Sequence, residues 1–142
     1  MQKSTQELLN NLKSCDDIQK YLDENKDEII GETLHDYLND LQQQRGLKTG
    51  QIASRSGQGE YVYKIMREAH RNPGRDVLLA IAIGMSLDMA ETQLLLRIAR
   101  VASLDPRNSR DSVIIYAINN GSTMDETNRI LDELGKETFK EG

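Results

Sequence analysis

Apolar residues recur at helical spacing in three successive segments between residues 34 and 69. In the first segment these residues follow the spacing i, i+3, i+4, i+7: Leu34, Tyr37, Leu38 and Leu41. A stripe with this period predicts an amphipathic helix. Gly46 follows directly after Arg45, which is typical of a helix C-terminus.

The second and third segments are shorter and are separated by the break Ser56-Gly57-Gln58-Gly59. We expect a helix over residues 49–55, with Ile52 and Ala53 facing inward, and another over residues 60–70. The apolar face of the last helix consists of Val62, Ile65, Met66 and Ala69, and the opposite side consists of Tyr61, Lys64, Glu68 and Arg71. Only the apolar face needs burial.

The chain before residue 33 predicts a small acidic arm. Ser4-x-x-Glu7 has the form of a capping box, and apolar residues at helical spacing follow it, so residues 4–25 are expected to form two short helices. Residues 26–32 would connect this arm to the rest of the chain as a helical turn carrying Ile29 and Ile30.

Residues 75–99 align without gaps to residues 110–134 at a constant offset of 35. Eight pairs are identical, among them Arg75/Arg110 and Asp76/Asp111. Each copy also contains a capping box at the matching place, Asp88-x-x-Glu91 and Thr123-x-x-Glu126. The pattern predicts two similar helical hairpins packed in a compact bundle, because two repeats are too few for a solenoid.

Composition favours an all-α fold for the whole chain. The 142 residues include no Trp, one Phe and two Pro, and 29% of them are charged. We therefore expect a helical bundle that contains three parts: the acidic arm over residues 1–32, a helix-turn-helix module over residues 33–87, and a C-terminal hairpin region over residues 88–142 packed on that module.

Several classes of protein are disfavoured. No apolar stretch approaches the eighteen or so residues of a membrane span, and the polar start is unlike a signal peptide, so we expect a cytoplasmic protein. Cys15 is the single cysteine, which excludes an internal disulfide. We find no phosphate-binding glycine loop, nucleophile constellation or metal-ligand spacing, so we expect neither an enzyme nor a cofactor.

The charge distribution points to nucleic acid even though the net charge is −5. Residues 45–75 contain seven basic and two acidic side chains, a net charge of +5, and the rest of the chain therefore carries −10. A basic block within an acidic chain is the pattern expected of a localised nucleic-acid surface.

Residues 33–87 resemble the lambda-repressor-like, or Cro-type, helix-turn-helix family. The resemblance rests on LKTGQIA at residues 47–53, on Ser56-Gly57, on RNPGRD at residues 71–76, and on the helix predicted over residues 77–84. It implies a bacterial transcriptional regulator, with repression as the expected effect, in which Ala53 lets two helices cross closely and Gly57 permits the tight turn. The second helix would approach a phosphate and the third would enter the major groove.

The chain departs from the family at two places. The turn after Gly57 is about one residue shorter than usual if Val62 and Ile65 are the packing positions, whereas the ungapped alternative buries Tyr63 and Met66. Helical periodicity favours the shorter turn. The family also often ends its reading helix with a glycine, where this chain has Ala69-His70.

The outward face of the module supplies the candidate DNA contacts. Candidates for base edges are Glu60, Tyr61, Tyr63 and Lys64. Candidates for the phosphate backbone are Lys48, Thr49, Gln51, Arg67, Arg71 and Arg75. Alternatively, Glu60 is a solvated carboxylate and the two tyrosines cap the core.

The expected partners are double-stranded DNA and a second copy of the chain, because one short reading helix covers few base pairs. The dimer contact would come from apolar surface on the C-terminal hairpin or on the arm. The alternative function is an adaptor or antirepressor that has lost DNA binding and acts through protein contacts, including those of the acidic arm. The net negative charge and Glu60 favour that alternative, and the basic block opposes it.

Overall fold

A computed structural model describes residues 3–25 and 33–142, and within these residues it contains nine α-helices and no strand. The predicted all-α class is therefore confirmed. The chain divides into two compact units, Met1–Gly31 and Glu32–Gly142, so the second unit includes both later segments of the predicted domain plan. The connection predicted over residues 26–32 lies outside the described residues. Among the described helices, none has the length and apolar character needed to cross a bilayer.

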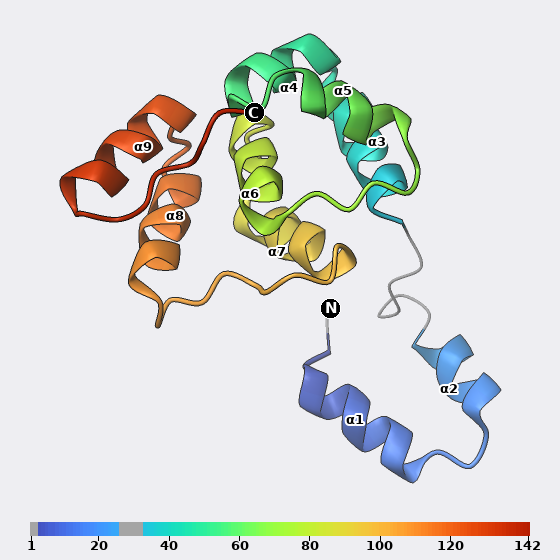
Figure 1. Ribbon diagram of the computed structural model, residues 1–142. Coiled ribbons are helices and arrows are strands. Elements are labelled where there is room, and N and C mark those ends of the chain that lie inside the picture. The colour runs from blue at the N-terminus through green and yellow to red at the C-terminus, as the bar shows by residue number, and fades with distance from the viewer. Residues whose placement is uncertain (1–2, 26–32) are drawn as a thin grey trace. The chain divides into compact units, whose positions relative to one another are not determined.

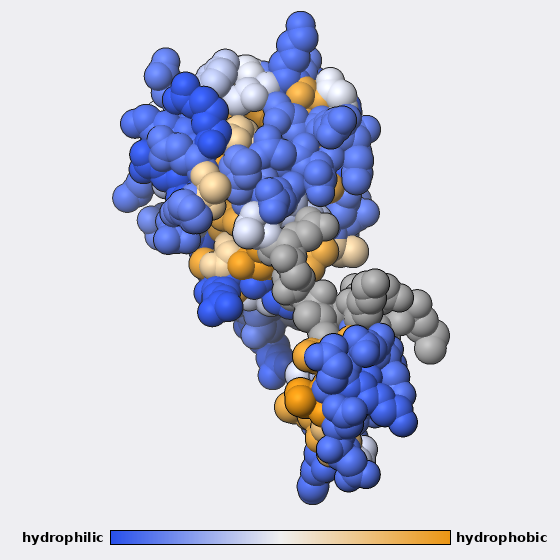
Figure 2. All heavy atoms as spheres, turned by 90° about the vertical axis from the view of Figure 1, so that its right-hand side faces the viewer, coloured by the Kyte–Doolittle hydropathy of each residue, from blue (hydrophilic) through white to orange (hydrophobic). Residues whose placement is uncertain are grey.

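The N-terminal unit consists of α1 (Thr5–Ser14) and α2 (Ile18–Glu24). Ser4 caps α1 by accepting a hydrogen bond from a backbone N–H, as the capping box predicts. Within this unit Tyr21 is buried and Leu8 is half-buried, while most of the other described apolar side chains are exposed. Large exposed hydrophobic residues on the two helices are Leu9, Leu12, Ile18 and Leu22. Figure 2 shows hydrophobic atoms along one edge of this unit in the view drawn.

The second unit begins with α3 (Leu34–Arg45), α4 (Thr49–Ser56) and α5 (Glu60–Arg67). Thr33 caps α3, and Gly46 ends it in the left-handed conformation that only glycine adopts without strain. The inward sides of the three helices contribute Leu38, Leu41, Ile52, Ala53, Val62, Ile65 and Met66 to one core. These are the positions that the helical periodicity predicts.

Helix α5 ends earlier than the pattern predicts. Glu68 already has an extended backbone, with φ −99° and ψ 117°, so residues 68–71 lie beyond the helix. Ala69, expected on the apolar face, is exposed because the chain has left the helical path at that point.

Four further helices complete the second unit: α6 (Arg75–Gly84), α7 (Met89–Ile98), α8 (Ser109–Asn119) and α9 (Met124–Glu133). Residues 78–84 of α6 are all buried, which makes α6 the central helix. Figure 1 shows α3, α4 and α5 on one side of α6 and the pair α8–α9 on the other. Arg45 of α3 forms an ion pair with Glu91 of α7, which joins the first helix of the unit to this second group.

The hairpins α6–α7 and α8–α9 make the same local interactions at positions 35 residues apart. Three sets of hydrogen bonds match. The bond from Thr92 to Asp88 corresponds to that from Thr127 to Thr123, and the bond from Arg75 to Ala102 corresponds to that from Arg110 to Glu137. The pair of bonds between Gln93 and Leu104 corresponds to the pair between Asn128 and Phe139. Left-handed backbone conformations also match at Ser86 and Gly121 and at Arg100 and Gly135. Residues 100, 102 and 104 and their counterparts 135, 137 and 139 lie beyond the aligned segments 75–99 and 110–134. The structural correspondence therefore extends into the segments after α7 and α9.

Two reciprocal ion pairs connect the two hairpins. Arg75 donates from Nη1 and Nη2 to the carboxylate of Asp111, at 3.0 and 2.7 Å. Arg110 donates in the same way to Asp76, at 3.0 and 2.8 Å. Each arginine therefore binds the aspartate of the other hairpin, as in an isologous contact between two equivalent units. A two-point guanidinium–carboxylate pair fixes orientation as well as distance.

The segment after α9 folds back onto the turn between α4 and α5. Phe139 is buried in the core, and Asn128 holds its backbone with two hydrogen bonds. Further along, the side chain of Gln58 donates to the carbonyl of Lys140 at 2.9 Å, and the N–H of Gly142 donates to the carbonyl of Gly57 at 3.0 Å. The chain therefore secures this turn from a sequence distance of more than 80 residues.

Candidate nucleic-acid interface

The turn between α4 and α5 is built from two glycines around a buried glutamine. Gly57 has φ 72° and Gly59 has φ 59°, a region that L-residues rarely adopt. The backbone N–H of Gln58 donates to the hydroxyl of Ser56, and that of Gly59 donates to the carbonyl of Ala53. These bonds close the turn in three residues and fix the direction in which α5 leaves α4.

Packing decides which side of α5 faces solvent. Val62 and Ile65 are fully buried against the core, as expected for the shorter of the two turn registers considered. Tyr63, which the other register buries, keeps 42% of its surface exposed. Lys64 and Arg67 are exposed on the same outward side of α5.

The N-terminus of α4 lies beside this outward side. A Cβ atom at Gly50 would be 3.0 Å from the hydroxyl of Tyr63, so the first turn of α4 and the middle of α5 are in close contact. Lys48, at the N-cap of α4, is exposed. We define the basic face by these exposed residues of α4 and α5: Lys48, Gln51, Tyr63, Lys64 and Arg67.

Two polar residues at the start of α4 organise the helix end. The side-chain oxygen of Gln51 accepts from the backbone N–H of Lys48 at 2.8 Å, which leaves the amide nitrogen of Gln51 as its remaining donor. The hydroxyl of Thr49 accepts from Gln42 at 2.9 Å and is half-buried. The positive end of a helix dipole and these donors together suit a phosphate group.

Acidic side chains also lie on or next to the basic face. Glu60 is exposed at the start of α5. Glu68 pairs with Arg71 just beyond the helix. The hydrogen bond from Arg71 lowers the pKa of Glu68, exposed as it is, and the charges of Arg71, Arg67 and Lys64 add to that effect. Reciprocally, Glu68 raises the pKa of Arg71.

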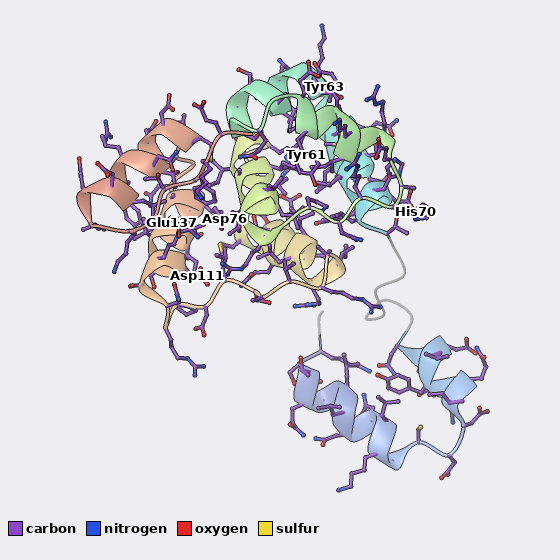
Figure 3. The ribbon with its side chains drawn as sticks, in the orientation of Figure 1. Tyr61, Tyr63, His70, Asp76, Asp111 and Glu137 are labelled. Carbon is purple, nitrogen blue, oxygen red and sulfur yellow. The ribbon has the colours of Figure 1, made fainter. Side chains whose placement is uncertain are left out.

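Two residues expected on this surface lie elsewhere. Tyr61 is half-buried against the core, on the side of α5 that faces α6, and it lines a hollow with Asp76 and Phe139. Figure 3 shows Tyr61 and Tyr63 on opposite sides of α5. Arg75 uses all three guanidinium nitrogens within the protein, on Asp111 and on the carbonyls of residues 102 and 103. Its pairing leaves it a poor candidate for a phosphate contact.

Asp111 is the partner that holds Arg75. Burial raises the pKa of the Asp111 carboxyl, but hydrogen bonds from Arg75 and from the N–H of Asp105, together with the charges of Arg75 and Arg110, outweigh burial and leave the pKa below its ordinary value. The carboxylate is therefore ionised at neutral pH, and its pairing with Arg75 persists there.

Arg55 is one of the seven basic residues between positions 45 and 75, but it is not among the predicted DNA contacts. The side chain is exposed in the last turn of α4, next to the glycine turn. It also lines a hollow that contains Asp125 and Glu141, so acidic groups lie near it. The sequence signal that could have identified Arg55 as a contact is its position two residues before the turn glycine, Gly57.

The described residues hold no cluster of three or more His, Cys, Asp or Glu side chains that could bind a metal ion. Comparison with family models, curated proteins and solved structures found no match to this chain.

Proposed function

We propose that the protein is a DNA-binding regulator in which α4 and α5 form a helix-turn-helix within a module that spans α3 to α6. The observation that carries the proposal is the outward side of α5. Lys64 and Arg67 project from it without an acidic ion-pair partner among the described residues, while the opposite side is fully packed. A helix with one packed side and one cationic side suits insertion into the major groove.

Within this proposal the residues of the basic face and their neighbours Glu60 and Arg71 have separate roles. Lys64 lies at the centre of α5 and reaches the acceptor edge of a guanine, while Tyr63 and Glu60 are neighbours on the same helix. Lys48, Gln51, Arg67 and Arg71 bind phosphates, which positions α5 without reading sequence. Thr49 makes no side-chain contact with DNA in this proposal and acts only by helping to hold the first turn of α4. Tyr61 and Arg75 have no role in DNA binding.

We also infer that α6–α7 and α8–α9 derive from one duplicated hairpin. The matching hydrogen bonds and left-handed positions at an offset of 35 support this, as does the reciprocal pairing of Arg75 and Arg110 with Asp111 and Asp76. In this interpretation α6 has two roles, because it belongs to the duplicated pair and also packs against α4 of the DNA-binding module.

The test is a titration of the protein against duplex DNA at two salt concentrations, with fluorescence anisotropy as the readout. The parent is expected to bind random duplex at low salt and to weaken as salt rises, because phosphate contacts release counterions. Sites selected from genomic fragments then supply a specific duplex. Lys64→Ala should weaken binding to that duplex by about 1 to 3 kcal/mol and relax preference at one base pair.

Two further variants separate the roles. Arg71→Ala should weaken binding to all sequences and reduce the salt slope by about one unit. Arg97→Ala is the matched control, because Arg97 is an exposed cation on α7, outside the module's reading helix, and its loss should leave both quantities unchanged. A parent protein with no affinity for DNA at low salt would instead favour the adaptor function.

The adaptor alternative has its own supporting observation. The exposed leucines and isoleucine of the N-terminal unit form an apolar surface that a protein partner would cover: Leu9, Leu12, Ile18 and Leu22. This alternative predicts capture of a partner protein that is lost when Leu9 and Leu12 are replaced by Ser, with no dependence on Lys64.

A further inference from the structure

A hollow of about 300 Å³ lies beside the segment that follows α5. Three stretches of chain line it: residues 33–34 at the start of α3, residues 69–73 after α5, and residues 98–100 at the end of α7. Figure 3 shows His70, from the second stretch, beside the start of α3. We call this site the α3–α7 hollow. Its volume is at the small end of the range found for ligand sites in proteins, so it has room for one small molecule.

The lining of the α3–α7 hollow combines positive charge with apolar surface. No lining residue is acidic, and the polar ones carry positive charge or can donate a hydrogen bond: Thr33, His70, Arg71, Asn72 and Arg100. The other half of the lining is apolar and includes Leu34, Pro73 and Ile98. The hollow beside Tyr61 differs, because three carboxylates line it. A lining of cations, donors and apolar side chains suits a small organic anion.

Arg100 lines this hollow from a backbone conformation that disfavours arginine. Its φ is 60°, in the left-handed region, whereas the equivalent residue of the second hairpin is Gly135, with φ 70°. Arg100 is exposed, and its side chain forms no hydrogen bond or ion pair with the described residues. No contact of this side chain therefore offsets the backbone strain. Strained residues of this kind cluster at sites that bind ligands.

Arg71 connects the hollow to the DNA contacts proposed above. Its guanidinium pairs with Glu68, and the charges of Lys64 and Arg67 also act on that carboxylate. An anion bound in the hollow would compete with Glu68 for Arg71. It would also place negative charge close to the reading helix, where DNA phosphates bind in the proposed function. We therefore expect occupancy of the hollow to weaken DNA binding.

We propose that the α3–α7 hollow binds a small organic monophosphate, in which Arg71 and Arg100 bind the phosphate oxygens and the apolar lining contacts the organic part. Guanidinium groups on two separate stretches of chain can approach a tetrahedral group from two directions, and each can donate two hydrogen bonds. Binding of the phosphate is independent of DNA. Only its effect on DNA binding rests on the proposed function.

The experiment titrates the full chain with phenyl phosphate in the absence of DNA, with isothermal calorimetry as the readout. Phenyl phosphate should bind about tenfold more tightly than inorganic phosphate, because burial of its ring removes apolar surface from water. Phenol lacks the anionic group and should bind more weakly than phenyl phosphate by at least the same factor.

The variant Arg100→Gly removes the guanidinium and relieves the backbone strain together. It should weaken phenyl phosphate binding about tenfold or more, while the midpoint of thermal denaturation should not fall, because glycine adopts the left-handed conformation freely. Ser86→Gly is the matched control. Ser86 is exposed, has φ 55° and lies outside the hollow, so the same backbone change there should leave phosphate binding unchanged. If Arg100→Gly is less stable than the parent, Arg100→Gln replaces it, since that variant keeps the backbone and removes only the charge.

Three results would overturn the proposal. They are phenyl phosphate that binds no more tightly than inorganic phosphate, equal binding by the parent and the Arg100 variant, and equal losses of binding in the Arg100 variant and Ser86→Gly. Loss of duplex affinity in the Arg100 variant, with no phenyl phosphate binding by the parent, would assign the hollow to the DNA backbone and would also overturn the small-molecule site.

A DNA titration tests the coupling separately. Phenyl phosphate should weaken binding of the parent to random duplex more than the same concentration of inorganic phosphate, which controls for salt. Equal effects of the two would overturn the expected competition for Arg71. A parent that binds phenyl phosphate but no duplex at low salt would contradict the proposed function and leave the phosphate site in place.

Discussion

Arg75 forms a two-point ion pair with Asp111, with Nη2 to Oδ2 at 2.7 Å, and thereby ties the start of α6 to the start of α8. The pair is largely removed from solvent, with side-chain exposures of 24% and 8%. Desolvation weakens the hydration of both charges, so the loss of either partner leaves the other poorly compensated. A cation that the sequence offers to DNA is therefore used to hold two hairpins together.

Removal of the Asp111 carboxylate should destabilise the second unit. We expect Asp111→Ala to lower the free energy of unfolding by about 2 kcal/mol, between the values for buried and surface pairs. Arg75→Ala should have a similar effect, and the double variant should lose clearly less than the two single variants added together. Chemical denaturation measures all three. Arg107→Ala is the control: it removes an ion pair whose arginine side chain is 93% exposed, so it should change the free energy of unfolding little. If the effects of Arg75→Ala and Asp111→Ala simply add, the two residues are not coupled.

Acid should weaken the second unit through its paired carboxylates. The hydrogen bond from Arg45 is the largest cause that lowers the pKa of Glu91, and the pKa of Asp111 is also below its ordinary value. Both groups thus bind protons more readily in the unfolded chain than in the folded one. Their contribution to stability is complete above the ordinary carboxyl pKa of about 4 and is lost as the pH falls through the lower folded values.

Denaturation at a series of pH values from about 6 to 3 checks this dependence. Asp111→Asn should unfold more easily at neutral pH and should lose less further stability on acidification than the parent. A parent and variant with parallel pH profiles would show that Asp111 titrates alike in the folded and unfolded states.

The crossing of α4 and α6 should be intolerant of a side chain at Gly84. A Cβ there would lie 2.8 Å from the backbone nitrogen of Ser56, which cannot move without shifting α4. We expect Gly84→Ala to lower the free energy of unfolding by about 1 to 3 kcal/mol, in spite of the better helix propensity of alanine. Gly50→Ala is the control, because its Cβ would meet only the flexible hydroxyl end of Tyr63 at 3.0 Å. Equal stability of the two variants in thermal denaturation would show that the helices separate easily.

If the basic face binds DNA, removal of Glu68 should strengthen binding. The carboxylate lies among Lys64, Arg67 and Arg71 and partly cancels their charge. Glu68→Gln should tighten binding to random duplex by about two- to fivefold at low salt, because it removes a negative charge that opposes the approach of the phosphates. Anisotropy titration measures the change in affinity. Glu133→Gln is the control: Glu133 is an exposed residue of α9, so the substitution changes the net charge equally but should increase DNA affinity less. The same gain in affinity from both variants would indicate a response to net charge alone.

Much of the local structure was predictable from neighbouring residues. Asp88 and Glu91 form the capping box that their spacing predicts, and Thr123 caps α9 as its own motif predicts. Val62 and Ile65 were identified as packing positions by periodicity alone. These features depend on hydrogen bonds and side-chain directions within one or two helical turns, which adjacent residues determine.

The sequence also contains a weak signal that the repeat continues beyond the aligned segments. The alignment at an offset of 35 ends at residue 134, although the next apolar pair at this offset, Leu104 and Phe139, also corresponds, and Gln93 and Asn128 within the alignment are both amides. Those pairs make the hydrogen bonds that seal the end of each hairpin. A match between similar but non-identical residues beyond an unmatched linker is too weak, in the sequence alone, to extend the alignment.

The sequence by itself predicted that the helices exist, most of their caps and the side that each of α3, α4 and α5 buries, but not the early end of α5 at Arg67. Only the tertiary structure decided the partner of Arg75, the inward orientation of Tyr61, the return of residues 139–142 to the glycine turn and the contact of Gly84 with Ser56. The physical reason is range. Helical periodicity and capping act over a few residues, whereas an exposed arginine and a paired one differ only in whether a carboxylate 36 residues away comes within reach of its guanidinium.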